Sequence, residues 1–304
     1  MPGRRAELPA ALTERPFTAG QALALGITRD MLRGPAVQRI DRGIFLDARL
    51  ELTLKRRLAG YLLMLPAETV VDSVTALQLN GVEVGPTEPY RFCTTAEHHP
   101  SRPSIVVRRV AELPPNVGKV SRTAPALVAA RTQLGLLDLV IAGDWLIRLR
   151  RAPYEAIRDG LRGAAGRDCL KARRAAELIR RRVDSPRETR LRLLIVLAGL
   201  PEPECNVDLG DELFFIGRVD LYLRAWNVAV EYEGDQHRTD AKQFAKDLGR
   251  YEDLAAAGYR IVRVSKVAMH RPRAVVDRIY RALLARGYVG APPDFGPEWR
   301  DAFE

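Results

Sequence analysis

The chain is poor in the residues that build disulfide frameworks and zinc sites. Among its 304 residues there are three cysteines, Cys93, Cys169 and Cys205, an odd number spread far apart. This spacing argues against a disulfide framework and against a Cys-x-x-Cys zinc site. The four histidines give only one adjacent pair, His98 and His99, in a loop-like segment where a surface position is the simplest interpretation.

Long apolar runs are also lacking. No stretch of 18 apolar residues occurs in the sequence, whereas a transmembrane helix needs about 20. The N-terminal sequence, MPGRRAELPA, lacks the apolar core of a signal peptide. We therefore expect a cytoplasmic protein that has no membrane partner.

Acidic residues are the minority among the charged residues. There are 38 Asp and Glu against 48 Lys and Arg, which gives a formal net charge of +10. Such a balance favours nucleic acid or another polyanion as partner, although arginine-rich composition can also reflect genomic base bias. Most of the excess lies in Arg148–Asp184, with 12 basic and 5 acidic residues. That segment is either a helical connector along phosphates or a solvated linker face.

Two alternating segments define the candidate site. Gly217–Leu223 and Val228–Glu233 each alternate apolar and polar residues around a four-residue break, a pattern that predicts a β-hairpin. In the register that a four-residue loop gives, Asp220 lies opposite Glu231, with Cβ atoms about 4.5–5.5 Å apart. Glu233 follows on the same face. The hairpin therefore gathers three carboxylates.

Carboxylates gathered in this way repel each other unless something neutralises them. A hard divalent cation such as Mg²⁺ or Mn²⁺ is the natural candidate, because it takes oxygen ligands from one or two carboxylates and from substrate phosphate. A solvated acidic face is the alternative interpretation. A register slip by one residue, which sends the two carboxylates to opposite faces, would also separate them.

A family resemblance rests on the same residues. The sequence contains, in order, Arg218-Val219-Asp220, Val230-Glu231-Tyr232-Glu233-Gly234 and Gln236-His237, followed by Asp247, Arg250, Leu254 and Gly258. This series resembles the endonuclease-like family related to very-short-patch-repair (Vsr) endonucleases, within the PD-(D/E)XK nuclease superfamily. The resemblance covers Ser185 to about Gly287. It implies a restriction-endonuclease-like αβββαβα core, a metal-dependent DNA endonuclease, and Mg²⁺ or Mn²⁺ as cofactor. The partner is DNA, with RNA also possible.

The resemblance also implies a set of site residues. The candidate catalytic residues are Glu188, Asp220, Glu231, Glu233, Gln236 and His237, and the candidate metal ligands are Asp220, Glu231 and Glu188. Glu188 follows Ser185 in a capping-box pattern, so a purely structural role is its alternative. The superfamily usually has a lysine where this sequence has Glu233. This departure supports a non-catalytic DNA-binding regulator as the alternative function.

A basic stripe follows the acidic hairpin. Basic residues recur at every fourth position from Arg238 into the predicted helix Thr239–Ala257, a spacing that places them on one helix face. These candidate nucleic-acid contacts are Arg238, Lys242, Lys246 and Arg250. The alternative is that acidic residues between them neutralise much of this basic charge within the helix.

The N-terminal segment Pro16–Leu46 is typical of a small helix-turn-helix with a wing. Thr18 and Thr28 are predicted caps of two short helices, and a hairpin follows them. Its candidate nucleic-acid contacts are Arg29, Arg33, Arg39 and Arg42, placed where a winged helix meets DNA. The segment resembles the winged-helix domain of AbiEi-type antitoxins, which implies a possible toxin–antitoxin partner. A structural or protein-docking module is the alternative.

The complete prediction is an α/β chain in five parts. It consists of a winged-helix-like domain (1–48), an α+β middle domain (49–150), a basic helical linker (151–184), an endonuclease-like domain (185–290) and a tail (291–304). The middle domain contains no group of residues typical of a catalytic site, and we expect nearly all of its residues to serve core packing.

Overall fold

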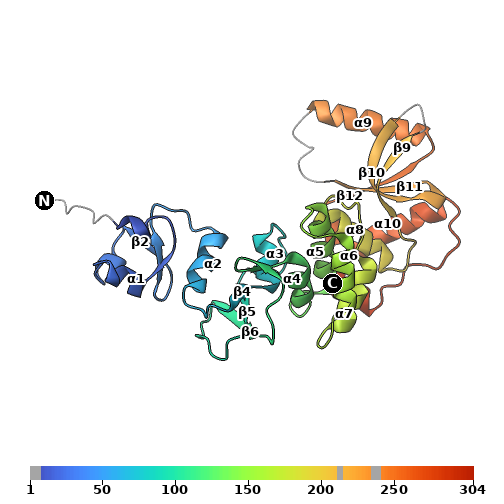
Figure 1. Ribbon diagram of the computed structural model, residues 1–304. Coiled ribbons are helices and arrows are strands. Elements are labelled where there is room, and N and C mark those ends of the chain that lie inside the picture. Colours follow the sequence, from blue (N-terminus) through green and yellow to red (C-terminus); the bar gives the residue numbers. More distant parts are fainter. Residues whose placement is uncertain (1–7, 211–214, 234–240) are drawn as a thin grey trace. The chain divides into compact units, whose positions relative to one another are not determined.

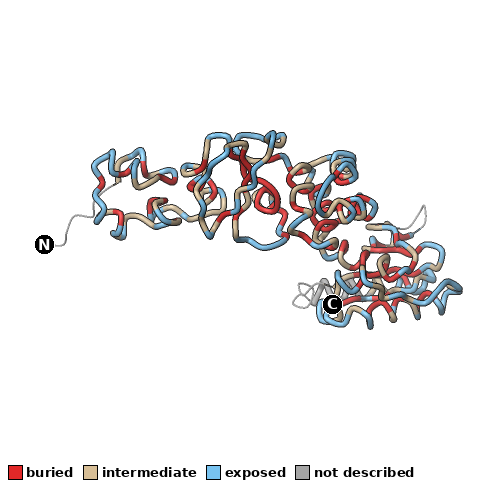
Figure 2. The backbone as a smooth tube through the Cα atoms, turned by 90° about the horizontal axis from the view of Figure 1, so that it is seen from below, coloured by how far each residue is buried: buried red, intermediate tan, exposed pale blue. Residues whose placement is uncertain are grey.

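A computed structural model describes residues 8–210, 215–233 and 241–304, with backbone alone for 241–248 (Figure 1). The chain is mixed α/β, as the sequence predicts, with three β-sheets in its described part. Contacts divide it into two compact units, Met1–Ala130 and Arg131–Glu304. In each unit the buried residues concentrate in strands and inner helices (Figure 2). Within the described ranges, no helix is both long enough and apolar enough to cross a membrane.

The first unit begins with a small three-stranded sheet. Its elements are β1 (Phe17–Thr18), α1 (Ala19–Ala24), the 3₁₀ turn η2 (Met31–Arg33), β2 (Val37–Asp41) and β3 (Ile44–Asp47). The antiparallel strand order is β1-β3-β2. Thr18 caps α1 in a capping box with Gln21, as predicted. The second predicted helix is shorter than expected. Only η2 forms, because Gly34 and Pro35 follow it at once.

A mixed five-stranded sheet forms the rest of this unit. Its elements are α2 (Leu54–Leu62), β4 (Thr69–Val71), α3 (Ser73–Leu79), β5 (Tyr90–Thr94), β6 (Ile105–Arg109), β7 (Asn116–Val117), β8 (Val120–Ser121) and α4 (Thr123–Ala130). The strand order is β6-β5-β4-β8-β7. Helix α2 connects this sheet to the first one. A Cβ atom at its Gly60 would lie 2.8 Å from Ile44 Cγ2, so glycine is required for the close packing.

The second unit opens with four helices, α5 (Leu136–Arg148), α6 (Tyr154–Arg162), α7 (Cys169–Leu178) and α8 (Pro186–Val196). Helix α5 packs against α7 and α8, so it belongs to this unit rather than to the middle domain in which the sequence placed it. The fully buried Arg192 guanidinium lies 3.1 Å from the Asp144 carboxylate, which also accepts a hydrogen bond from Thr189. This buried pair fixes α8 against α5.

Much of the basic charge of Arg148–Asp184 is neutralised within the second unit. Its ion pairs include Arg148–Asp184, Arg167–Asp168, Lys171–Asp168, Arg174–Glu177, Arg174–Glu298, Arg180–Glu202 and Arg181–Glu155. Two of the acidic partners, Glu202 and Glu298, come from outside the segment. The segment therefore serves packing within the unit, which weighs against a track for phosphates.

A four-stranded sheet lies beyond these helices. It consists of β9 (Glu204–Gly210), β10 (Phe215–Leu223), β11 (Val228–Glu233) and β12 (Arg260–Ser265), in the order β12-β11-β10-β9. Its other elements are α9 (Ala241–Ala256), α10 (Pro272–Leu284) and α11 (Pro297–Phe303). Strands β11 and β12 are parallel and α9 connects them. From α8 to α10 the element order is the predicted αβββαβα. Helices α8 and α10 pack on one face, and α9 on the other (Figure 1).

The segment expected as a tail is part of the core instead. Helix α11 buries Trp299 completely against the α8 and α10 face of the sheet. The Trp299 indole N–H donates to the Leu194 carbonyl at 3.1 Å. Arg273 of α10 pairs with Glu304 at 2.6 Å, which holds the far end of α11.

We predict that Trp299→Ala lowers the free energy of unfolding by about 3–5 kcal/mol, because it removes a large buried side chain and leaves a cavity. Chemical denaturation of the full chain measures this change. Val289→Ala is the matched control, since Val289 is 97% exposed. Equal stability of the two variants would contradict the packing of α11.

Candidate functional site

The acidic hairpin has the register that the sequence predicts. Leu223 pairs with Val228 and Leu221 with Val230, so Asp220 and Glu231 are the next residues along β10 and β11. The regular pairing ends there. Oδ2 of Asp220 accepts a hydrogen bond from the Tyr232 backbone N–H at 2.8 Å. The Asp220 carboxylate is therefore held by the backbone of the neighbouring strand.

Glu231 has a different set of partners. Its carboxylate is buried beneath α9, where both oxygens accept hydrogen bonds from the Arg250 guanidinium at 2.9 Å. The Tyr251 hydroxyl donates a third hydrogen bond at 2.6 Å. This differs from the expectation that Glu231 and Asp220 hold a cation together. The physical reason is that Glu231 faces α9, which supplies a fixed positive charge.

Gly217 allows Arg250 to reach across the sheet. A Cβ atom at Gly217 would lie 2.8 Å from Arg250 Cδ, so a larger residue would displace the arginine side chain. Arg250 also donates to the backbone carbonyl of Arg218 at 2.9 Å. The side chain expected to contact phosphate therefore tethers α9 to β10 and β11.

Glu233 is also paired with an arginine. Its carboxylate accepts from the Arg263 guanidinium of β12. The Tyr251 ring stacks with both cations of this face, its centroid lying 4.8 Å from the Arg250 guanidinium carbon and 4.5 Å from that of Arg263. Two glutamates and two arginines thus compensate each other around one tyrosine.

Glu188 lies at the start of α8, where Ser185 caps the helix by accepting from the Glu188 backbone N–H at 3.2 Å. The Glu188 side chain does not reach back to the Ser185 amide. Its Oε2 accepts from the Asp184 backbone N–H at 2.9 Å and from the Asn206 side-chain amide at 2.7 Å. Glu188 is buried. Its carboxylate is therefore fixed by two donors on one oxygen.

Asn206 is a site residue that the sequence analysis missed. It is buried in β9 with a left-handed φ of 50°, and its side chain bridges Glu188 and the Arg182 carbonyl, the latter at 2.7 Å. Asparagine is depleted in strands and tolerates positive φ, so its place between apolar strand residues was a weak available signal. Its partner on α8 could not be inferred from local sequence.

Asp220 carries an unusual protonation equilibrium. The pKa of its carboxyl is raised from 3.8 to about 7, chiefly by burial and also by the negative charges of Glu188 and Glu231. The Tyr232 N–H and the positive charge of Arg250 act in the opposite direction. Asp220 is therefore a half-buried acid whose negative charge is only partly compensated, in contrast to that of the buried Glu231.

The arrangement limits which residues could hold a metal ion. No group of three or more His, Cys, Asp or Glu side chains is arranged for metal binding in the described part of the chain. Asp220 and Glu188 each keep one carboxylate oxygen that accepts no hydrogen bond from a described residue. Mg²⁺ needs only one or two carboxylates because it keeps several waters. Those two residues, and not Glu231, are the ones that would hold it.

Several predicted residues fall outside the described part. Gln236, His237 and Arg238 lie in 234–240, and the side chains of Lys242 and Lys246 lie in the range with backbone alone. Their assignment stays a prediction.

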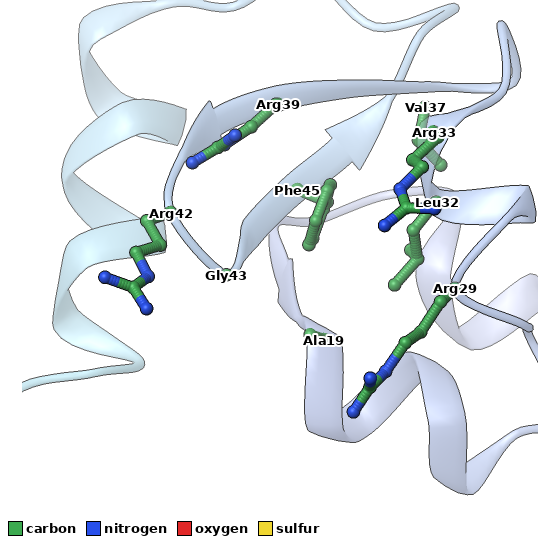
Figure 3. Close-up of a pocket in the computed structure, with 9 residues that line it drawn as sticks. All are labelled: Ala19, Arg29, Leu32, Arg33, Val37, Arg39, Arg42, Gly43 and Phe45. Carbon is green, nitrogen blue, oxygen red and sulfur yellow. The ribbon is translucent and has the colours of Figure 1, made fainter.

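The four predicted N-terminal arginines line one hollow, which we call the arginine hollow (Figure 3). It has a volume of about 810 Å³ and is lined by Ala19, Arg29, Leu32, Arg33, Val37, Arg39, Arg42, Gly43 and Phe45. All four arginines are exposed. Arg33 forms one exposed ion pair with Asp30 at 3.2 Å, a weak interaction in water. The other three arginines form no ion pair with a described residue. Their charge therefore remains available to an anion.

We compared the chain with protein-family models, curated proteins and solved structures, and found no match to any of them.

We predict that Asp220→Asn stabilises the chain above neutral pH. In the native state Asp220 keeps its proton up to about pH 7, whereas in the unfolded state it loses the proton near 3.8. The native state therefore binds more protons between these values, and the free energy of unfolding falls as the pH rises through them. The loss is on the order of 4 kcal/mol, and asparagine avoids it while still accepting from Tyr232.

Urea denaturation at pH 5 and pH 8 measures this effect. The stabilisation by Asp220→Asn should be larger at pH 8 than at pH 5. An equal effect at both pH values would show that the carboxyl group is not perturbed.

Proposed function

We propose that the chain binds nucleic acid, DNA in the first place, through the arginine hollow. The observation that carries this proposal is that Arg29, Arg33, Arg39 and Arg42 all line one concave surface. Arginine suits phosphate because its planar guanidinium donates two parallel hydrogen bonds. Three of these charges have no acidic partner among the described residues, so phosphate contact does not require the breaking of an internal pair.

The second candidate function is metal-dependent phosphodiester hydrolysis in the C-terminal domain. A specific observation favours it, namely that Glu188 lies close enough to Asp220 to raise its pKa, while neither carboxyl group forms an ion pair with a described arginine. Such an arrangement is costly unless a cation binds. When bound, Mg²⁺ or Mn²⁺ would lower the pKa of a bound water and offset charge on the reacting phosphate.

The protein's own residues have distinct roles in this second candidate. Asp220 and Glu188 would hold the ion, and Asn206 orients the Glu188 carboxylate. Glu231 and Arg250 fix α9 against the sheet and so hold β10 and β11 in register. Catalytic roles for Glu233, Gln236 and His237 belong to the same proposal. So do membership of the Vsr-like endonuclease family and a cytoplasmic location.

A DNA-binding regulator of the AbiEi antitoxin type would bind DNA through the arginine hollow but would not hydrolyse it. Promoter binding without cleavage, together with a toxin as protein partner, would favour it over the endonuclease.

We predict that alanine substitution of Arg39 or Arg42 weakens DNA binding and lowers the slope of log affinity against log salt by about 1 per arginine. Fluorescence anisotropy across a salt series measures both quantities. Arg122→Ala is the matched control, since Arg122 is an exposed arginine of the same unit that does not line the hollow. Equal loss in the control would show a diffuse charge effect instead of a site.

We predict that the purified protein nicks or linearises plasmid DNA with Mn²⁺, and that Asp220→Ala reduces cleavage to the background of the assay. Glu231→Gln should retain cleavage, because glutamine can still accept a hydrogen bond from Arg250. Cleavage that survives Asp220→Ala would point to a contaminant or to a different site. A folded Glu231→Gln variant without activity would show that Glu231 acts directly.

A further inference from the structure

We propose that the arginine hollow binds an unpaired nucleotide of a single strand, with the base against Phe45 and the flanking phosphates on the arginines. This inference rests on the proposed nucleic-acid binding and adds the form of nucleic acid that the site selects. It concerns the first unit alone and does not depend on hydrolysis.

In the described part of this unit, the position of the helix that reads a duplex holds only a short turn. A protein enters the major groove with an α-helix or a two-stranded ribbon. At the place of a second helix this unit has only the three-residue turn η2 (Met31–Arg33). The surface beside it is concave, with a volume in the range of small-ligand pockets. A recess of this kind suits a group that enters it better than a convex duplex.

The turn of the β2–β3 hairpin is held against the protein. The Arg102 guanidinium donates to the Arg42 backbone carbonyl at 2.8 Å, and the Ser104 hydroxyl donates to Asp41 Oδ2 at 3.2 Å. Arg102 also lies 3.8 Å from the Asp41 carboxylate. A wing that inserts into a groove must project from the surface, whereas this turn is tied to the loop before β6.

Phe45 supplies an aromatic surface within the hollow. Its ring stacks on Phe17, with centroids 6.1 Å apart and an interplanar angle of 23°. Phe17 is buried, so it fixes the position of the Phe45 ring. In Figure 3 that ring lies among the four arginines. No described arginine stacks on it. Base stacking on aromatic side chains is the usual, sequence-tolerant mode of single-strand binding.

The arginines lie on both sides of this ring. Figure 3 shows Arg39 and Arg42 on one side of Phe45, and Arg29 and Arg33 on the other. The phosphates on either side of a base stacked on Phe45 would therefore lie near positively charged side chains. Leu32 and Val37 add apolar lining beside the ring. An aromatic surface between two pairs of arginines matches a flat base between two phosphates.

The test compares three labelled oligonucleotides by fluorescence anisotropy with the full-length protein at fixed salt. These are a single strand, the duplex of the same sequence, and the single strand with abasic sites. We expect the single strand to bind about tenfold more tightly than the duplex and the abasic strand. The abasic strand tests the role of the base without any change in the protein.

A variant tests the aromatic surface directly. Phe45→Leu keeps an apolar side chain against Phe17 but removes the stacking surface. The ratio of its single-strand affinity to its duplex affinity should fall to about 1, whereas loss of both affinities in equal proportion would overturn the role of the ring. Thermal unfolding verifies that the variant is folded. Arg39→Ala should weaken the binding of both the single strand and the duplex, because it removes a positive charge and leaves the stacking surface intact.

The outcomes separate this inference from the proposed function. Arginine-dependent binding that is as tight for the duplex as for the single strand overturns the inference alone. The same holds if abasic sites do not weaken binding. Displacement of the strand by polyglutamate at equal charge concentration would show that the hollow recognises charge only. Absence of binding to every oligonucleotide would overturn both the inference and the proposed DNA binding.

Discussion

The ion pair between Arg250 and Glu231 determines how the C-terminal domain uses its acidic residues. A buried carboxylate needs a positive charge or several donors, and Glu231 receives both from α9. Asp220, one strand away, forms no ion pair with a described arginine and keeps its proton to a much higher pH. Two acidic residues that look equivalent in sequence therefore have different chemistry. The difference originates in α9, outside the hairpin that carries them.

Local patterns predicted the elements of the fold well. The alternation of Gly217–Leu223 gave the correct strand and register, and the capping patterns at Thr18 and Ser185 gave the correct helix starts. These features depend on neighbours along the chain. The packing of α5 with α7 and α8, and of α11 into the core, depends on residues distant in sequence, so the boundaries predicted for those parts differ from the structure.

The two candidate sites were predictable from sequence to different degrees, because one is built from residues close together in the chain and the other from distant ones. All four N-terminal arginines that were predicted from the helix and hairpin pattern line one hollow, because they lie close together in sequence. In the endonuclease-like domain, only two of the three predicted metal ligands are placed where they could bind an ion. Asp220 and Glu188 remain candidates, whereas the partner of Glu231 comes from α9. Asn206 was not predictable from local sequence, because its hydrogen bond to Glu188 depends on the proximity of β9 to the start of α8.

The position of α11 has a consequence for biosynthesis. The hydrogen bond from Trp299 to Leu194 joins residues 105 positions apart. While a ribosome extends the chain, the sheet and its first helices emerge well before the indole that completes their core. Contacts of such long range form late and slowly. The apolar face that Trp299 covers therefore stays exposed in the nascent domain until α11 has emerged.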